Sequence, residues 1–73
     1  METVKKYWIS PPPLDCDICH DGINTVFVDA KTRIGPWGCL CDTCHALHGY
    51  GLGIGKGQRY EKQSDGKWLK VGG

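Results

Sequence analysis

The chain has 73 residues, five cysteines and a net charge of +1. This length predicts one small domain whose apolar core alone is marginal, and the odd cysteine count excludes complete internal disulfide pairing. No apolar run follows Met1–Lys6, and no stretch approaches the roughly 20 apolar residues of a membrane span. We therefore expect no signal peptide, no membrane contact and a cytoplasmic location with reduced thiols.

Residues 1–14 are expected to form an N-terminal arm. Its three consecutive prolines, Pro11–Pro13, exclude a helix and favour polyproline II. Tyr7, Trp8 and Ile9 are too apolar for a free tail, so we expect them to pack over the metal-binding part, as a short edge strand. An exposed partner-binding arm is the alternative.

Residues 15–49 contain two Cys-x-x-Cys pairs, Cys16/Cys19 and Cys41/Cys44, with 21 residues between them. This spacing predicts a zinc-binding module, because two such turns place four thiolates around one tetrahedral ion at roughly 2.3 Å. We expect one structural Zn²⁺ held by these four cysteines. Four substitute ligands stay open at this point: Cys39, His20, His45 and His48.

The segment between the pairs predicts a β-hairpin. Residues 24–30 suit a strand because residues 25–28 are β-branched or aromatic. Residues 29–32 suit a turn, and residues 33–40 suit a return strand with Trp37 as a lid over the core and the zinc. Cys41 to Gly49 predicts a short helix, with Asp42 and Thr43 in its first turn and a left-handed Gly49 at its end.

Residues 50–73 are expected to form a glycine-rich loop and a C-terminal hairpin on the same domain. Glycine alternates from Gly49 to Gly57, but Lys56 is not followed by the Ser or Thr of a phosphate-binding loop. Either Leu52 and Ile54 fill apolar gaps, or the loop contacts an anion or a partner. Asp65-Gly66 predicts a type I′ turn, with Tyr60 and Trp68 paired across the hairpin.

The order of knuckle, hairpin and helix predicts a small zinc-stabilised α+β fold of treble-clef type; a zinc ribbon is the alternative. The sequence also resembles a group of small, uncharacterised zinc-finger proteins of bacteriophages and prophages. The resemblance covers about Cys16 to Val71 and rests on both cysteine pairs, Gly35-Pro36-Trp37, the pattern from Gly49 to Tyr60, and Asp65-Gly66-Lys67-Trp68. It implies a zinc role for the four cysteines and a phage or prophage source, and it implies no activity.

The functional expectation is a non-enzymatic binding module. Four thiolates would close the zinc, and no cluster of acids accompanies the histidines, so we expect no enzyme and no small-molecule substrate. We expect a phage protein-interaction factor that acts on a host protein; the alternative is a zinc finger that binds single-stranded nucleic acid. Residues 49–73 carry a balance of +3, which favours a partner surface formed by Lys56, Arg59, Tyr60 and Trp68.

Overall fold

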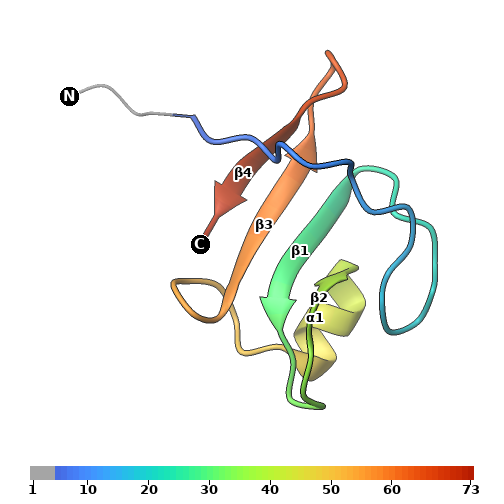
Figure 1. Ribbon diagram of the computed structural model, residues 1–73, viewed down its shortest axis with the longest axis vertical. Helices are drawn as coiled ribbons and strands as arrows, with labels where there is room; N and C mark the ends of the chain where they lie inside the picture. Colours follow the sequence, from blue (N-terminus) through green and yellow to red (C-terminus); the bar gives the residue numbers. More distant parts are fainter. Residues whose placement is uncertain (1–4) are drawn as a thin grey trace.

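A computed structural model describes residues 5–73; the first four residues of the expected N-terminal arm lie outside the described residues. Residues 5–73 form four strands and one helix (Figure 1). In chain order these are β1 (Val26–Lys31), β2 (Trp37–Leu40), α1 (Asp42–His48), β3 (Gly57–Lys62) and β4 (Trp68–Gly72). This is the small α+β architecture that the sequence predicts.

The four strands form one antiparallel sheet in the order β2-β1-β3-β4. The first hairpin pairs Ala30 with Gly38, and the second pairs Lys62 with Trp68. The two hairpins are joined because β1 also pairs with β3, where Phe27 lies opposite Tyr60. The C-terminal hairpin is therefore a continuation of the sheet that carries the cysteine-rich part.

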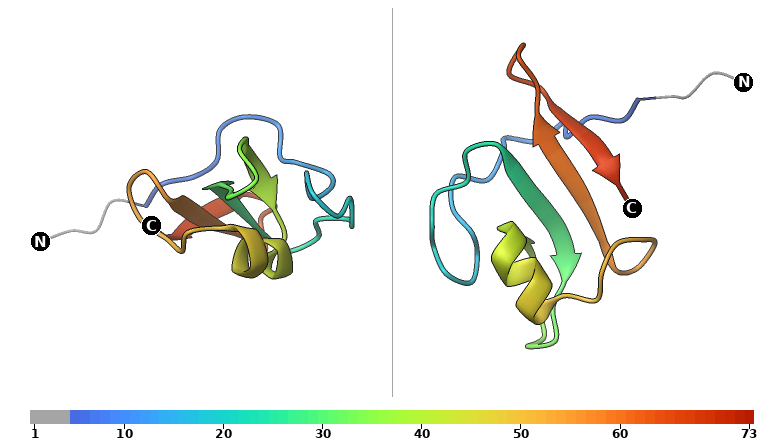
Figure 2. Two further views of the ribbon diagram at one scale, coloured as in Figure 1. Left: turned by 90° about the horizontal axis from the view of Figure 1, so that it is seen from below. Right: turned by 180° about the vertical axis from the view of Figure 1, so that it is seen from behind.

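Side-chain alternation along the strands gives the sheet two different faces. On one face, Val28, Ala30 and Leu40 are buried with Cys16 and Cys44 against the side covered by α1. On the opposite face, three buried aromatic residues, Phe27, Tyr60 and Trp68, form a second core. Figure 2 shows α1 on one side of the sheet and the N-terminal arm on the other.

The N-terminal arm packs on the aromatic face and not over the metal-binding part, so that expectation is wrong. Its backbone pairs with the outer edge of β4: Trp8 N donates to Trp68 O at 2.9 Å, and Lys70 N donates to Lys6 O at 2.7 Å. The Trp8 ring then meets Phe27 and Tyr60 edge-on, with centroids 5.3 and 5.4 Å away. Edge-to-face aromatic contacts of this kind explain why Trp8 prefers this side.

The other edge of the sheet is covered as well. Asp17 N donates to Cys39 O at 2.9 Å, and Cys39 N donates back to the Asp17 carboxylate at 2.8 Å. The first cysteine pair is thereby attached to β2. An uncovered strand edge can pair with another chain. Here the N-terminal arm lies along the edge at β4 and Asp17 binds the edge at β2, so both edges are partly covered.

Three local expectations need correction. The first turn spans Thr32 to Pro36 and not residues 29–32, because Thr32 Oγ1 donates to Pro36 O at 2.7 Å and Gly35 supplies a φ of 126°. Trp37 is no lid: 47% of it is exposed, and its Nε1 donates to Asp29 at 2.6 Å. Gly49 ends α1 with φ at −94°, outside the left-handed region.

The second hairpin also differs from its expected form. The turn has three residues, since Gly66 N donates to Gln63 O and Gln63 N donates to Lys67 O. Only Gly66 has a positive φ there, at 86°, so the turn is not type I′. Tyr60 lies opposite Lys70, not Trp68, and a register shift interrupts the strand pairing at Arg59/Tyr60.

Candidate metal centre

Four cysteines meet at one end of the sheet. The Sγ atoms of Cys16, Cys19, Cys41 and Cys44 all lie within 4.8 Å of one another. Four sulfurs placed 2.3 Å from a central ion define a tetrahedron with edges of about 3.8 Å. The distance between Cys19 Sγ and Cys41 Sγ is 3.7 Å. The donors therefore fit a single metal ion that prefers tetrahedral thiolate coordination.

A tight turn positions the first pair. Cys16 N donates to Asp21 O, and His20 N donates to Cys16 O, both at 2.9 Å. The turn is completed by a left-handed residue, His20, with φ at 64°. Ile18 N points at Cys16 Sγ from 3.5 Å. Backbone N–H groups directed at sulfur stabilise thiolate charge, as a metal ligand requires.

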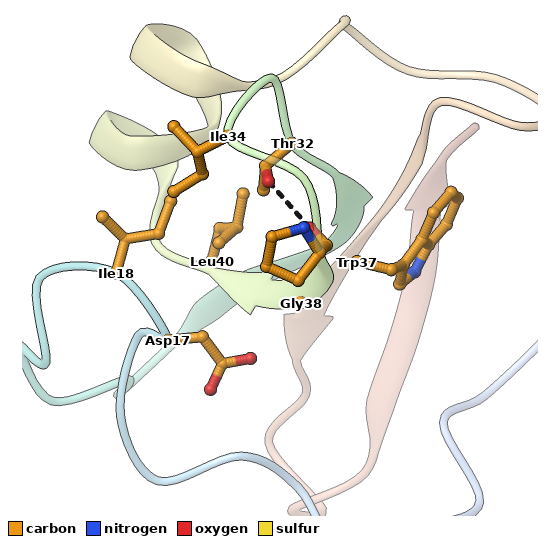
Figure 3. A pocket seen from close by; sticks show the side chains of 8 residues that line it. Asp17, Ile18, Thr32, Ile34, Trp37, Gly38 and Leu40 are labelled. Carbon is orange, nitrogen blue, oxygen red and sulfur yellow. Dashed lines mark hydrogen bonds between the residues drawn. The ribbon is translucent and has the colours of Figure 1, made fainter.

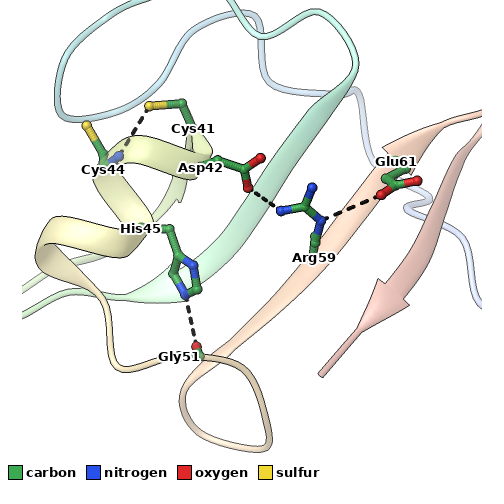
Figure 4. Close-up of polar contacts among 7 residues, drawn as sticks. All are labelled: Cys41, Asp42, Cys44, His45, Gly51, Arg59 and Glu61. Carbon is green, nitrogen blue, oxygen red and sulfur yellow. Dashed lines mark hydrogen bonds and ion pairs between the residues drawn. The ribbon is translucent and has the colours of Figure 1, made fainter.

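The start of α1 positions the second pair. Cys41 is the N-cap of the helix, and its Sγ accepts a hydrogen bond from Cys44 N at 3.4 Å (Figure 4). A cysteine thus takes the capping position that Ser, Thr, Asp or Asn occupies in most helices. The helix places Cys44 one turn away, buried against the sheet.

The surroundings of Cys16 and Cys44 shift the pKa values of these two thiols in opposite directions. Burial opposes ionisation of Cys16, but backbone hydrogen bonds from Cys19, Cys41 and Ile18 outweigh it and lower its pKa to about 6. Burial, followed by hydrogen bonds with the neighbouring cysteines, raises the pKa of Cys44 to about 12. Cys16 therefore ionises readily, whereas Cys44 resists ionisation mainly because it is buried, with the negative charge of Cys16 as a lesser cause. A divalent cation would favour the thiolate form of both residues because its charge attracts the sulfurs.

The other residues considered as ligands lie apart from this group, which within residues 5–73 consists of the four cysteines alone. Cys39 packs on the aromatic face, where burial and then the charges of Asp29 and Asp17 raise its pKa to about 11.

The histidines of α1 make other contacts. His45 directs Nε2 to Gly51 O at 2.9 Å (Figure 4). The backbone carbonyl of His48, at the end of α1, accepts a hydrogen bond from Arg33 N.

The expected partner surface on β3 and β4 is largely internal, which corrects that prediction. Tyr60 and Trp68 are 8% and 7% exposed and belong to the aromatic core. Burial, followed by the charge of Asp29, raises the pKa of Tyr60. Arg59 forms an ion pair with Asp42 on α1 and a second with Glu61 at 3.6 Å (Figure 4). Of the four residues proposed, only Lys56 is exposed and without an ion pair among the described residues.

The glycine-rich loop does not fill the core with apolar side chains. Leu52 is 41% exposed and Ile54 is 96% exposed. Part of the glycine pattern has a steric cause: a Cβ on Gly57 would lie 2.9 Å from Ala30 Cβ and 3.1 Å from Gly51 O. The strand and the loop can approach each other here only without a side chain at this position.

Two aspartates within the Cys-x-x-Cys pairs make contacts that the cysteine spacing alone does not predict. Asp17 lies between the cysteines of the first pair, and its carboxylate attaches that turn to Cys39 N. Asp42, expected only to support the helix start, also forms an ion pair with Arg59 of β3. Each Cys-x-x-Cys pair has an aspartate directly after its first cysteine, and this shared pattern is the sequence feature that indicates both contacts.

Comparison with protein-family models, with curated proteins and with solved structures gives no match to this chain. The residues that the structure describes include no helix long and apolar enough to cross a membrane.

Proposed function

We propose that this protein is a non-enzymatic, zinc-stabilised module that binds another protein. The observation that carries the proposal is the closed group of four cysteines within 4.8 Å. Four thiolates fill a tetrahedral zinc and leave no position for a substrate or an activated water, which is the arrangement of structural sites. Zn²⁺ is the metal proposed because soft thiolates and tetrahedral geometry favour it.

The order of the elements around the four cysteines supports a treble-clef assignment over a zinc ribbon. The second cysteine pair begins α1, whereas a ribbon would place it on another hairpin. The first pair lies in a turn that precedes the β1–β2 hairpin. This order is the one on which the treble-clef proposal rests.

Single-strand nucleic-acid binding is the weaker alternative. Such binding needs aromatic faces on which bases stack, beside cations that follow the phosphates. Tyr60 and Trp68, which suggested this function, are buried, and Arg59 is bound to Asp42 and Glu61. Of the aromatic residues in 49–73 only Tyr50 is exposed, at 45%, and its ring already lies beside Lys31 and Arg33, so a single stacking position accompanies the remaining lysines.

We further propose a bacteriophage or prophage source, and with it a bacterial cytoplasm and a host protein as partner. This part rests on the resemblance of the cysteine pairs, the glycine pattern and Asp65-Gly66-Lys67-Trp68 to small phage zinc-finger proteins. The exposed apolar side chains are compatible with a docking role, since Ile9, Leu14 and Ile54 are all more than 80% exposed.

The test is capture from bacterial lysate with the zinc-loaded protein immobilised. Nuclease-treated and untreated lysates are compared, and the retained material is washed at increasing salt. A protein that is retained after nuclease treatment and at high salt, and lost from a Cys44→Ser bait, supports the proposal. Retention that disappears with nuclease, or falls steeply with salt, would overturn it in favour of nucleic acid.

A further inference from the structure

A groove lies between the first cysteine turn and the β1–β2 turn, and its volume is about 360 Å³. We call it the knuckle groove. One wall is Asp17 and Ile18; the other is the turn from Thr32 to Pro36; the floor includes Leu40 (Figure 3). Ile18 and Ile34 point toward each other from the two walls, and the Asp17 carboxylate lies at a separate place on the rim (Figure 3).

The walls of the knuckle groove are held in place before any partner arrives. Thr32 is 3% exposed and its hydroxyl closes the β1–β2 turn on Pro36 O. Leu40 is fully buried in the core around Cys16 and Cys44, and Ile18 packs against that core. The metal-binding cysteines thus stabilise the floor and one wall. A preformed apolar groove of this kind binds without a large ordering cost.

The charges at the knuckle groove are unbalanced. The ion pairs among residues 5–73 all involve Arg59, so Asp17 faces no cation there. The cations of the neighbouring turn are directed elsewhere: Lys31 Nζ and Arg33 Cζ lie 5.7 and 5.2 Å from the centre of the Tyr50 ring. A zinc bound to four thiolates would add a charge of −2 beside this wall. The groove therefore combines apolar walls with an uncompensated negative charge.

We infer that the knuckle groove receives a lysine or arginine side chain from a partner protein. The methylene groups of such a side chain match the apolar surface of Ile18 and Ile34, and its cationic head matches Asp17. A free small ligand fits less well, because the groove offers one charged group and few others to orient a molecule. A macromolecular partner supplies further contacts outside the groove. This inference rests on the proposed protein-binding function and specifies its surface.

The test uses the zinc-loaded protein and two small probes of equal chain length. N-acetyl-lysine N-methylamide carries the ammonium, and N-acetyl-norleucine N-methylamide has the same aliphatic chain without it. Each is titrated while amide NMR shifts are recorded. We expect shifts at Ile18, Ile34 and Gly38, and a lysine affinity about fivefold higher, as one solvent-exposed ion pair of ~1 kcal/mol gives.

Three variants locate the effect. Asp17→Asn keeps an acceptor for Cys39 N but removes the charge, so it should abolish the preference for lysine. Ile34→Ser, at a 61% exposed position, should weaken both probes. Asp65→Asn, at the tip of the distant hairpin, is the matched charge control and should change neither. Every variant must keep a native spectrum and one zinc per chain. If the Asp17→Asn protein does not, the comparison of the two probes on the wild-type protein and on Ile34→Ser tests the inference instead.

Equal affinity for the two probes, or shifts that map outside the knuckle groove, would overturn the inference. So would an Asp17→Asn protein that folds and still prefers lysine. The lysate capture described above is independent of this groove. If capture succeeds and the probes fail, the protein-binding proposal stands and the binding surface is elsewhere. If capture fails and the probes bind, the protein-binding proposal is overturned, and only the affinity of the knuckle groove for a lysine side chain stands.

Discussion

At the scale of single residues, side-chain alternation along β2 separates the fifth cysteine from the other four. Leu40 points into the core with Cys16 and Cys44, and Cys39, its neighbour in the strand, packs on the aromatic face. A sequence in which Cys39 and Cys41 are two residues apart leaves either as a ligand. The strand ends at Leu40, so the chain turns before Cys41 and brings only Cys41 to the other three cysteines of the cluster.

The first prediction concerns these two cysteines. Cys44→Ser should lower zinc affinity by on the order of a hundredfold, since about a quarter of the roughly 10–16 kcal/mol of a structural site is lost. Cys39→Ser is the matched control and should keep one zinc per chain. Metal content after dialysis against a competing chelator measures both. Full zinc in the Cys44→Ser protein would exclude the four-cysteine site.

The second prediction concerns pH. At neutral pH Cys44, with its pKa raised to about 12 mainly by burial, holds its proton in the metal-free protein and must release it to bind zinc. Zinc affinity should therefore rise as pH rises from 6 to 8 and fall on acidification, with protons released on binding. Competition titrations at several pH values give this slope, and a pH-independent affinity would contradict thiolate coordination.

The third prediction tests the steric role of a glycine. Gly57→Ala should destabilise the protein by about 1–3 kcal/mol, as overpacking does, because its Cβ would lie 2.9 Å from Ala30 Cβ. Gly22→Ala is the control, since a Cβ there has nothing within 4 Å. Chemical unfolding of the zinc-loaded proteins compares the two. Equal stability of both variants would show that β3 and β1 are not packed as described.

At the scale of elements, the N-terminal arm is the part whose location sequence patterns could not supply. Trp8 and its neighbours are clearly apolar, but both faces of the sheet offer apolar surface. The choice depends on the Trp8 contacts with Phe27 and Tyr60, which come from segments far apart in the chain. The burial of Tyr60 and Trp68 cannot be predicted from the sequence for the same reason, because an aromatic residue between lysines has the same local sequence pattern whether its side chain is exposed or buried.

The fourth prediction follows from this packing. Trp8→Ala should lower the free energy of unfolding by about 2 kcal/mol, less than the loss of a fully buried tryptophan, because Trp8 is only half-buried. Ile9→Ala is the control, since Ile9 is 96% exposed and its replacement should have little effect. Thermal or urea unfolding measures the difference, and a neutral Trp8→Ala protein would mean that the arm is not part of the core.

At the scale of the whole molecule, local patterns predicted the elements better than their assembly. The cysteine spacing, the helix after Cys41 and both hairpins could be read from neighbouring residues, and all are present. The pairing of β1 with β3 could not, because it joins strands separated by β2, α1 and the glycine-rich loop. That pairing is what makes one sheet with two small cores.

Both cores are small. One contains five buried residues, two of which are cysteines, and the other contains three buried aromatic residues. Cores of this size give marginal stability to a chain of 73 residues. A metal held by the four cysteines would join the first cysteine turn to α1, so its removal should remove the contact that orders the first core and leave four thiols in close proximity.

The most direct test of this account is the amide NMR spectrum of the zinc-loaded protein during titration with a strong zinc chelator. We predict that the dispersion of the native spectrum collapses as one equivalent of zinc is removed, and returns when one equivalent is added back under reducing conditions. Structural zinc supplies roughly 10–16 kcal/mol of apparent binding free energy, which exceeds the stability expected of cores this small. A metal-free protein that keeps its native spectrum would contradict the central claim that the four cysteines hold the metal on which this fold depends.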